Sequence, residues 1–233
     1  HTDLIAGLPY ETFEMFKDSF DKAYSLRAHQ LQLGFLKLLK GAPLNDMLEE
    51  HSYIFSERPP YEIVSDKYIS HKEILRLKEI EDVLEKFYNS GHYIISLEMI
   101  EKYFETPFEM YSEMADFLKC KNLIFKPMSL RQSFDIMFLF ASRFAEKDAL
   151  HTLKKMLLID YFSSNKTDLP PDCLKDIWKP ERSLSGRSGD IMKSCGIEDF
   201  RTHRLRIIDD EIYIFDVAEE NPVTGRYSYI KVN

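Results

Sequence analysis

Three sequences typical of a helix N-terminus recur between residues 70 and 132 of this chain. They are Ser70-His71-Lys72-Glu73, Thr106-Pro107-Phe108-Glu109 and Ser129-Leu130-Arg131-Gln132. In such a capping box the hydroxyl and the carboxylate or amide bind the free N–H groups of the first helical turn. Further helices are predicted near residues 96–104 and from Asp148 to about Tyr161. Five helices joined by short loops predict an all-α module in this part of the chain.

The first residues of the chain carry a different pattern. A short apolar run from Thr2 to Leu8 ends at Pro9 and predicts a buried strand. Residues 11–26 carry apolar side chains at helical spacing, and residues 29–36 form a second strand-like run. A strand, a helix and a strand with short joins form a βαβ unit, so we expect two parallel strands in one sheet covered by helices.

The end of the chain predicts a small sheet. Three strand-like runs lie at residues 204–208, 211–217 and 226–232. Asp209-Asp210 and residues 221–225 predict the turns between them, so the strands would form an antiparallel meander. Before them, residues 172–179 indicate a short helix and residues 180–200 a loop. The predicted fold class is therefore α+β and mostly helical.

Composition and charge exclude several classes of protein. The chain is 44% hydrophobic and 30% charged, so it can bury a core and is not disordered. Its net charge of −8 argues against non-specific nucleic-acid binding, which needs a positive surface. No apolar run approaches the roughly 18 residues of a membrane span, so no membrane partner is expected. The cysteines Cys120, Cys173 and Cys195 lack metal-motif spacing, so we expect no metal site, free thiols and a cytoplasmic location.

The most informative motif lies at the end of the first predicted strand. It reads Asp3-Leu4-Ile5-Ala6-Gly7-Leu8-Pro9-Tyr10-Glu11-Thr12 and resembles a late barrel strand of radical S-adenosylmethionine (SAM) enzymes, where the pattern is roughly D-(L/I)-I-x-G-L-P-x-E-T. Further stretches add to the likeness, at residues 32–37, 40–44, 59–62 and 221–226. Together they are similar to the C-terminal part of cobalamin-binding-domain-containing radical SAM proteins, often called Fe–S oxidoreductases.

The resemblance implies a domain organisation and a site. Residues 1–66 would be the C-terminal end of a radical SAM barrel, which is a partial TIM-type barrel. Residues 67–233 would be the family's helical domain of unknown function, ending in the β-meander. Ligands of parallel sheets lie at the C-terminal ends of the strands. The residues expected to border SAM, mainly its adenine, are therefore Ile5, Gly7, Leu8, Gly34 and Phe35. The alternative is that the apolar members of this set only pack strand against helix.

The chain also departs from the family. The cluster motif C-x-x-x-C-x-x-C and the cobalamin-binding domain that precedes the barrel are both absent. The three cysteines are too far apart to replace the cluster ligands. We therefore expect a C-terminal fragment with no cofactor and no activity of its own, whose partners are the missing N-terminal part of its chain and a substrate of unknown type. The parent protein would perform radical chemistry with a [4Fe–4S] cluster and SAM, and with cobalamin as an optional cofactor.

Two other functions stay open at this point. Five capped helices without a cluster of polar residues also suit a non-catalytic docking or lid domain, which would bind a substrate or a protein partner. A basic stretch between Arg182 and Arg206 could receive an anionic substrate or, in an RNA-modifying enzyme, a phosphate group. Charge runs of this kind usually lie on solvated loops, and nucleic acid is not the expected partner of an acidic chain.

Overall fold

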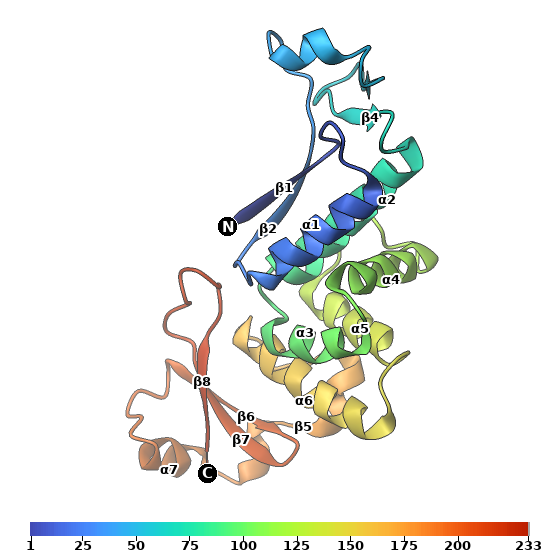
Figure 1. Cartoon of the computed structure of the whole chain (residues 1–233). Coiled ribbons are helices and arrows are strands. Elements are labelled where there is room, and N and C mark those ends of the chain that lie inside the picture. Colours follow the sequence, from blue (N-terminus) through green and yellow to red (C-terminus); the bar gives the residue numbers. More distant parts are fainter. Residues whose placement is uncertain (233) are drawn as a thin grey trace. The chain divides into compact units, whose positions relative to one another are not determined.

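A computed structural model describes residues 1–232, and the chain divides into two compact units. The first unit comprises His1–Asn89 and Phe104–Lys126, and the second comprises Ser90–Tyr103 and Pro127–Asn233. The fold class is α+β and mostly helical, which confirms the prediction (Figure 1). Across residues 1–232, none of the helices combines the length and the apolar character needed to cross a membrane.

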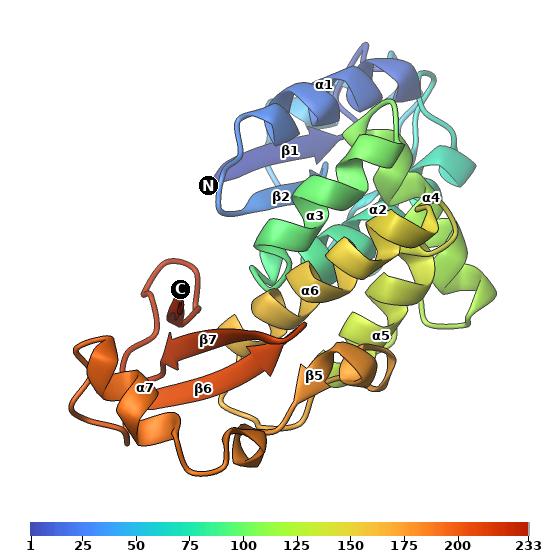
Figure 2. The ribbon, with the colours of Figure 1, turned by 90° about the horizontal axis from the view of Figure 1, so that it is seen from below.

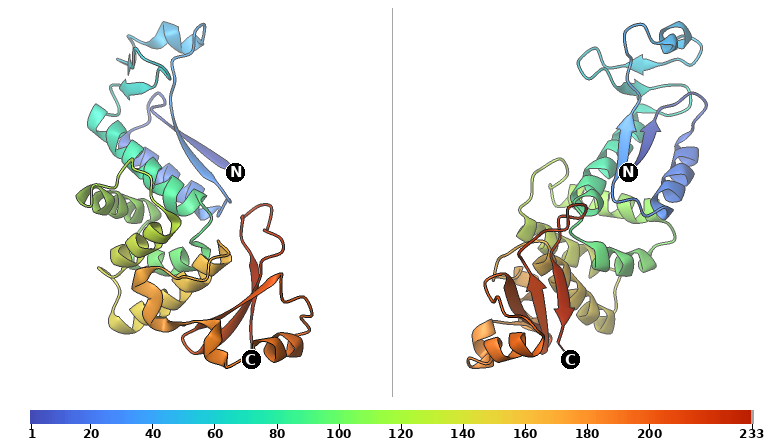
Figure 3. Two further views of the ribbon diagram at one scale, coloured as in Figure 1. Left: turned by 180° about the vertical axis from the view of Figure 1, so that it is seen from behind. Right: turned by 90° about the vertical axis from the view of Figure 1, so that its left-hand side faces the viewer.

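The first unit begins with the predicted strand–helix–strand segment. Strands β1 and β2 pair in parallel, and Figure 3 shows them as two blue arrows that point the same way. Its elements in chain order are β1 (Thr2–Ala6), α1 (Phe13–Ser25), β2 (Leu31–Phe35), the 3-10 helix η1 (Pro43–Met47), β3 (Ile54–Phe55), β4 (Ile63–Ser65), α2 (His71–Leu84), the π-helical turn η2 (Glu85–Asn89) and α4 (Pro107–Cys120). Strands β3 and β4 form a separate antiparallel pair.

Local capping and aromatic packing explain the helices of this unit. The hydroxyl of Ser70 accepts from Glu73 N, and the carboxylate of Glu73 accepts from Ser70 N, so the predicted capping box of α2 is confirmed. Helix α1 buries Phe20, whose ring packs on Phe108 and Tyr111 of α4. Helix α2 packs on β2 and β4. Two of the predicted helices therefore pack with the βαβ segment, and the domain boundary after residue 66 stays a prediction.

Among the described residues, the second unit combines four α-helices with a four-stranded antiparallel sheet. The strand order is β5-β6-β7-β8, and Figure 2 shows β6 and β7 side by side with α7 next to β6. Its elements are α3 (Ile94–Ile100), η3 (Glu101–Tyr103), α5 (Leu130–Ala141), α6 (Lys147–Ser163), η4 (Asp172–Ile177), β5 (Trp178–Lys179), η5 (Glu181–Leu184), α7 (Ser188–Ser194), β6 (His203–Ile208), β7 (Glu211–Asp216) and β8 (Ser228–Lys231). A small core joins α7 to the sheet through Met192, Leu205 and Ile214.

Three details of the second unit differ from the predictions. Residues 180–200 are not simply a loop, because they contain η5 and α7. The sheet has a fourth strand, since Trp178 and Lys179 pair with Ile208 and Ile207 of β6. Helix α6 begins before Asp148, with Glu146 at the N-cap, so Asp148 lies in its first turn and is not its cap. The first two differences have the same cause, because contacts with the distant strand β6 stabilise segments of weak local pattern.

A buried ion pair connects three segments of the second unit. Asp160 of α6 is fully buried, and its Oδ1 lies 2.8 Å from Nη1 of Arg226. Its Oδ2 accepts from the backbone N–H and the hydroxyl of Ser96, at 2.8 and 2.7 Å. Arg226 also donates to the carbonyl oxygen of His92 at 3.1 Å. Burial raises the pKa of Asp160, and the charge of Arg226 and the hydrogen bonds from Ser96 oppose this shift without cancelling it.

We expect His92, which lies beside this ion pair, to reduce stability in mildly acidic solution. Burial and the charge of Arg226 lower the pKa of His92 from its ordinary value of 6.5. The folded chain therefore holds the ring neutral while the unfolded chain takes up a proton, so stability is lost as the pH falls below about 6.5. Urea denaturation followed by the fluorescence of Trp178, the single tryptophan, should show this loss. The loss should be smaller in His92→Gln, and an unchanged pH dependence in that variant would contradict the assignment.

Candidate functional site

The parallel strands β1 and β2 bring two of the predicted site residues together. Their register pairs Ile5 with Gly34 and Ala6 with Phe35. One face of this pair is covered, because Ala6, Leu33 and Phe35 are buried. The other face carries Ile5, whose side chain is 47% exposed, next to Gly34. The predicted set therefore divides, with Ile5 and Gly34 on the open face.

Phe35 lies on the covered face and is packed by a charged neighbour. The ammonium group of Lys78 sits 4.3 Å from the centre of its ring, as a cation–π contact. Lys78 also forms an ion pair with Glu62, which belongs to one of the stretches that resemble radical SAM proteins. Phe35 is 6% exposed. In the first unit its ring therefore acts as part of the core between β2 and α2.

Gly7 and Leu8 lie in the loop that follows β1. Gly7 has a φ of +91°, and a Cβ atom there would meet Cδ1 of Ile63 at 2.5 Å. The hydroxyl of Tyr53 donates to the carbonyl oxygen of Gly7 at 3.0 Å. Ile63 thus occupies the space that the missing side chain of Gly7 leaves open. Leu8 is 40% exposed. The role of these two residues in binding SAM stays a prediction.

An aromatic cluster adjoins this loop, and nothing in the sequence indicated it. Tyr10, with a φ of +67°, places its ring 5.1 Å from the ring of His51 in an edge-on contact. His51 is fully buried, and its Nδ1 lies 3.0 Å from the hydroxyl of Tyr68. Within residues 1–232 its Nε2 has no hydrogen-bond partner. The rings of Tyr10, His51, Tyr53 and Tyr68 therefore form one contiguous cluster.

The last two residues of the motif have separate surroundings. Thr12 is the N-cap of α1, and its hydroxyl accepts from the backbone N–H of Met15 at 3.3 Å. Burial raises the pKa of Glu11, and its Oε2 has no hydrogen-bond partner among the residues that the structure describes. The threonine is thus explained by helix capping, and Glu11 is the motif residue with unused polar capacity.

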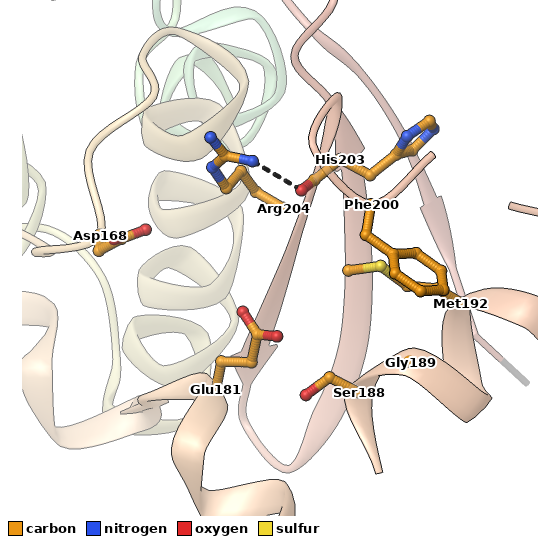
Figure 4. A pocket seen from close by; sticks show the side chains of 8 residues that line it. All are labelled: Asp168, Glu181, Ser188, Gly189, Met192, Phe200, His203 and Arg204. Atoms are coloured by element: carbon orange, nitrogen blue, oxygen red, sulfur yellow. Dashed lines mark hydrogen bonds between the residues drawn. The ribbon is translucent and has the colours of Figure 1, made fainter. Parts of the chain in front are cut away.

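The second unit contains a pocket of about 420 Å³ beside strand β6. Figure 4 shows the carboxylate of Glu181 pointing toward the space between Arg204 and the pair Met192 and Phe200. Asp168, Ser188, Gly189 and His203 complete the lining. The surroundings thus combine an arginine, two carboxylates and an apolar wall.

The basic stretch found in the sequence does not form one cationic surface at this pocket. Arg206 is buried, and its Nη2 lies 2.6 Å from Oδ1 of Asp168. Arg201 is almost fully exposed and pairs with Asp199. Only His203 and Arg204 of the stretch line the pocket, and they do so together with two acidic residues.

The cysteines and other ligating side chains do not gather into a metal site in the part of the chain that the structure describes. Within residues 1–232 no group of three His, Cys, Asp or Glu side chains could hold a metal ion. The three cysteines are free thiols. Burial and the nearby Asp135 raise the pKa of Cys173 far above its usual range, so this thiol stays protonated.

One comparison with known proteins identifies a family, and it adds no activity. A search of the curated proteins found no match. A family model described as "Protein of unknown function (DUF4080)" matches residues 49–188. The match covers more than half of the chain, from just after η1 through the helices to the start of α7. The chain therefore belongs to the DUF4080 family.

Proposed function

We propose that this chain is the C-terminal part of a radical SAM iron–sulfur enzyme of the Fe–S oxidoreductase type. The observation that carries the proposal is the parallel pairing of β1 and β2, with Gly34 beside Ile5 on an uncovered face. Parallel sheets are normally larger than two strands and covered on both faces. Within residues 1–232, β1 pairs with β2 alone. A strand that belongs to a larger barrel would have such a free edge and such an uncovered face when the rest of the barrel is not part of the chain.

The residues on the bare face fit part of a SAM molecule. A Cβ atom at Gly34 would meet only the carbonyl oxygen of Leu4, at an ordinary 3.6 Å, so the space above Gly34 is open. The exposed side chain of Ile5 lies next to it and offers an apolar surface for a flat ring such as adenine. The ligands of a [4Fe–4S] cluster are expected from another part of the enzyme, because this chain does not group its cysteines. The free thiols suit a reducing compartment such as the cytoplasm.

A substitution at Gly34 tests the proposal in the full-length protein. When bound, SAM and a reduced cluster supply the 5′-deoxyadenosyl radical, whose formation is measured as 5′-deoxyadenosine under anaerobic, reducing conditions. Gly34→Leu should lower SAM affinity by about tenfold or more, because the new side chain fills the adenine surface. Gln30→Leu is the matched control. It places a leucine side chain before the start of β2, at the opposite end of the strand from Gly34.

The outcomes separate clearly. Loss of SAM binding in Gly34→Leu, with unchanged thermal stability and normal binding in Gln30→Leu, is the expected result. A full-length protein that forms no cluster and no 5′-deoxyadenosine would overturn the proposal. So would an upstream sequence without the C-x-x-x-C-x-x-C motif.

The alternative function is that of a docking or lid domain for a substrate or protein partner. The polar pocket in the second unit favours it, because this pocket lies among residues outside the βαβ segment. Binding of a partner that survives deletion of residues 1–44 would support this alternative. Loss of that binding on the same deletion would count against it.

A further inference from the structure

The pocket beside β6 contains two charged groups, Arg204 and Glu181, that are not held in a close ion pair. Arg204 donates from Nη1 to the carbonyl oxygens of Arg201 and His203, at 3.0 and 2.9 Å. Within residues 1–232, neither Arg204 nor Glu181 forms an ion pair, with each other or with another residue. Asp168 is different, because its carboxylate lies 2.6 Å from the buried Arg206, whose charge acts on Glu181 only at longer range. The pocket therefore presents one cation and one anion, neither of which is held in a close ion pair.

This charge pattern selects among classes of ligand. A phosphate or another dianion would be attracted by Arg204 but repelled by the carboxylate of Glu181. A polyamine would be attracted by Glu181 but repelled by the guanidinium of Arg204. A molecule that carries one charge of each sign satisfies both groups, and an unsatisfied charge in the pocket penalises the other classes. Arginine binds a carboxylate well because its planar fork can donate two parallel hydrogen bonds.

The apolar wall of the pocket narrows the class further. Met192 is 4% exposed, whereas the ring of Phe200 remains 39% exposed. Both residues line the pocket. Figure 4 shows them on the side of the pocket away from Arg204. A pocket of about 420 Å³ lies in the range that takes small molecules. A ligand with an apolar side chain would cover the exposed ring.

We propose that this pocket binds a small zwitterion of the amino-acid class. Its carboxylate would lie on Arg204, its ammonium group on Glu181, and its apolar side chain against Met192 and Phe200. The proposal does not rest on radical SAM chemistry, because all of its residues belong to the second unit. It can be tested on the chain as it stands, without cofactors.

Calorimetric titration with L-phenylalanine and two single-charge analogues tests the proposal. Phenethylamine lacks the carboxylate, and 3-phenylpropionate lacks the ammonium group. L-Phenylalanine should bind at least about tenfold more tightly than either analogue, because each analogue leaves one charge of the pocket unpaired. L-Leucine should also bind, whereas inorganic phosphate should bind more weakly than L-phenylalanine.

Two substitutions assign the charges. Arg204→Gln should weaken L-phenylalanine by about tenfold and should not weaken phenethylamine, which has no carboxylate to place on Arg204. Glu181→Gln should weaken L-phenylalanine similarly and should not weaken 3-phenylpropionate, which has no ammonium group to place on Glu181. The matched controls are Arg201→Gln and Glu198→Gln, which remove neighbouring exposed charges that do not line the pocket. Urea denaturation followed by Trp178 fluorescence checks that each variant is folded.

Several results would overturn the proposal. One is the absence of binding for both L-phenylalanine and L-leucine up to about 10 mM. Another is equal affinity for L-phenylalanine and a single-charge analogue, which would mean that only one charge of the pocket contributes to binding. Tighter binding of phosphate would identify an anion site in its place. An effect of Arg201→Gln as large as that of Arg204→Gln would mean that the pocket is not involved.

Discussion

Asp160→Ala should lower the free energy of unfolding of the second unit by about 3–5 kcal/mol, because removal of one partner of a buried ion pair leaves the other charge unpaired. Arg226 is 9% exposed, so without Asp160 its guanidinium would keep only backbone carbonyl acceptors, at Gly91 and His92. Ser96 would lose two hydrogen bonds at the start of α3. One substitution thus loosens α3, α6 and the turn before β8 together.

Urea denaturation followed by Trp178 fluorescence measures this effect. Asp176→Ala is the matched control. Asp176 forms an ion pair with Lys154, which belongs to the same helix as Asp160, but the side chain of Asp176 is 60% exposed. The control should cost at most about 1 kcal/mol. In a double-mutant cycle, Asp160→Ala with Arg226→Ala should cost less than the sum of the two single changes. Additive costs would show that the two side chains are not coupled.

The elements that sequence analysis located correctly are those with a local cause. The capping box at Ser70 needs only residues of the same helical turn. The turn at Asp209-Asp210 also has a local cause, since both residues have positive φ, as a tight two-residue hairpin turn requires. The parallel βαβ segment follows from the spacing of its apolar runs. Local chemistry therefore predicted the starts of α2, α4 and α5, the hairpin and the first sheet.

The elements that were missed depend on distant contacts. Helix α7 has a weak apolar pattern, and its buried Met192 packs on Leu205 and Ile207 of β6. Strand β5 exists because Trp178 and Lys179 pair with β6. No window of neighbouring residues contains either contact. Propensity is a weak prior for such short segments, so tertiary packing decided their structure.

The candidate sites show the same limit. The motif around Gly7 is local and was found, but the rings that surround it come from His51, Tyr53 and Tyr68 in a later part of the chain. At the pocket, the basic stretch pointed to Arg204, whereas Asp168 is contributed by the segment after α6. Sequence alone indicated a basic stretch, and the fold converted part of it into a pocket of mixed charge.

Gly7→Ala is expected to destabilise the first unit by about 2–5 kcal/mol, which combines overpacking with a left-handed backbone. The φ of +91° disfavours any side chain, and the new Cβ would lie 2.5 Å from Cδ1 of Ile63, where one of the two must move. Amide hydrogen exchange of peptides from β1, β2 and β4 would measure the loss, together with urea denaturation followed by circular dichroism. The result distinguishes the two interpretations of Gly7. A glycine kept for packing costs stability when replaced, whereas one kept only for a ligand costs SAM affinity.

Two further variants separate the steric cost from the backbone cost. Gly41 has a similar φ of +80°, but a Cβ atom there meets nothing within 4 Å, so Gly41→Ala should cost only about 1–2 kcal/mol. Ile63→Val removes the Cδ1 atom that would clash and should make Gly7→Ala with Ile63→Val more stable than Gly7→Ala alone. Rescue of this kind is expected because the two positions share one contact. Equal costs at Gly7 and Gly41, with no rescue, would show that Ile63 does not require a glycine at the end of β1.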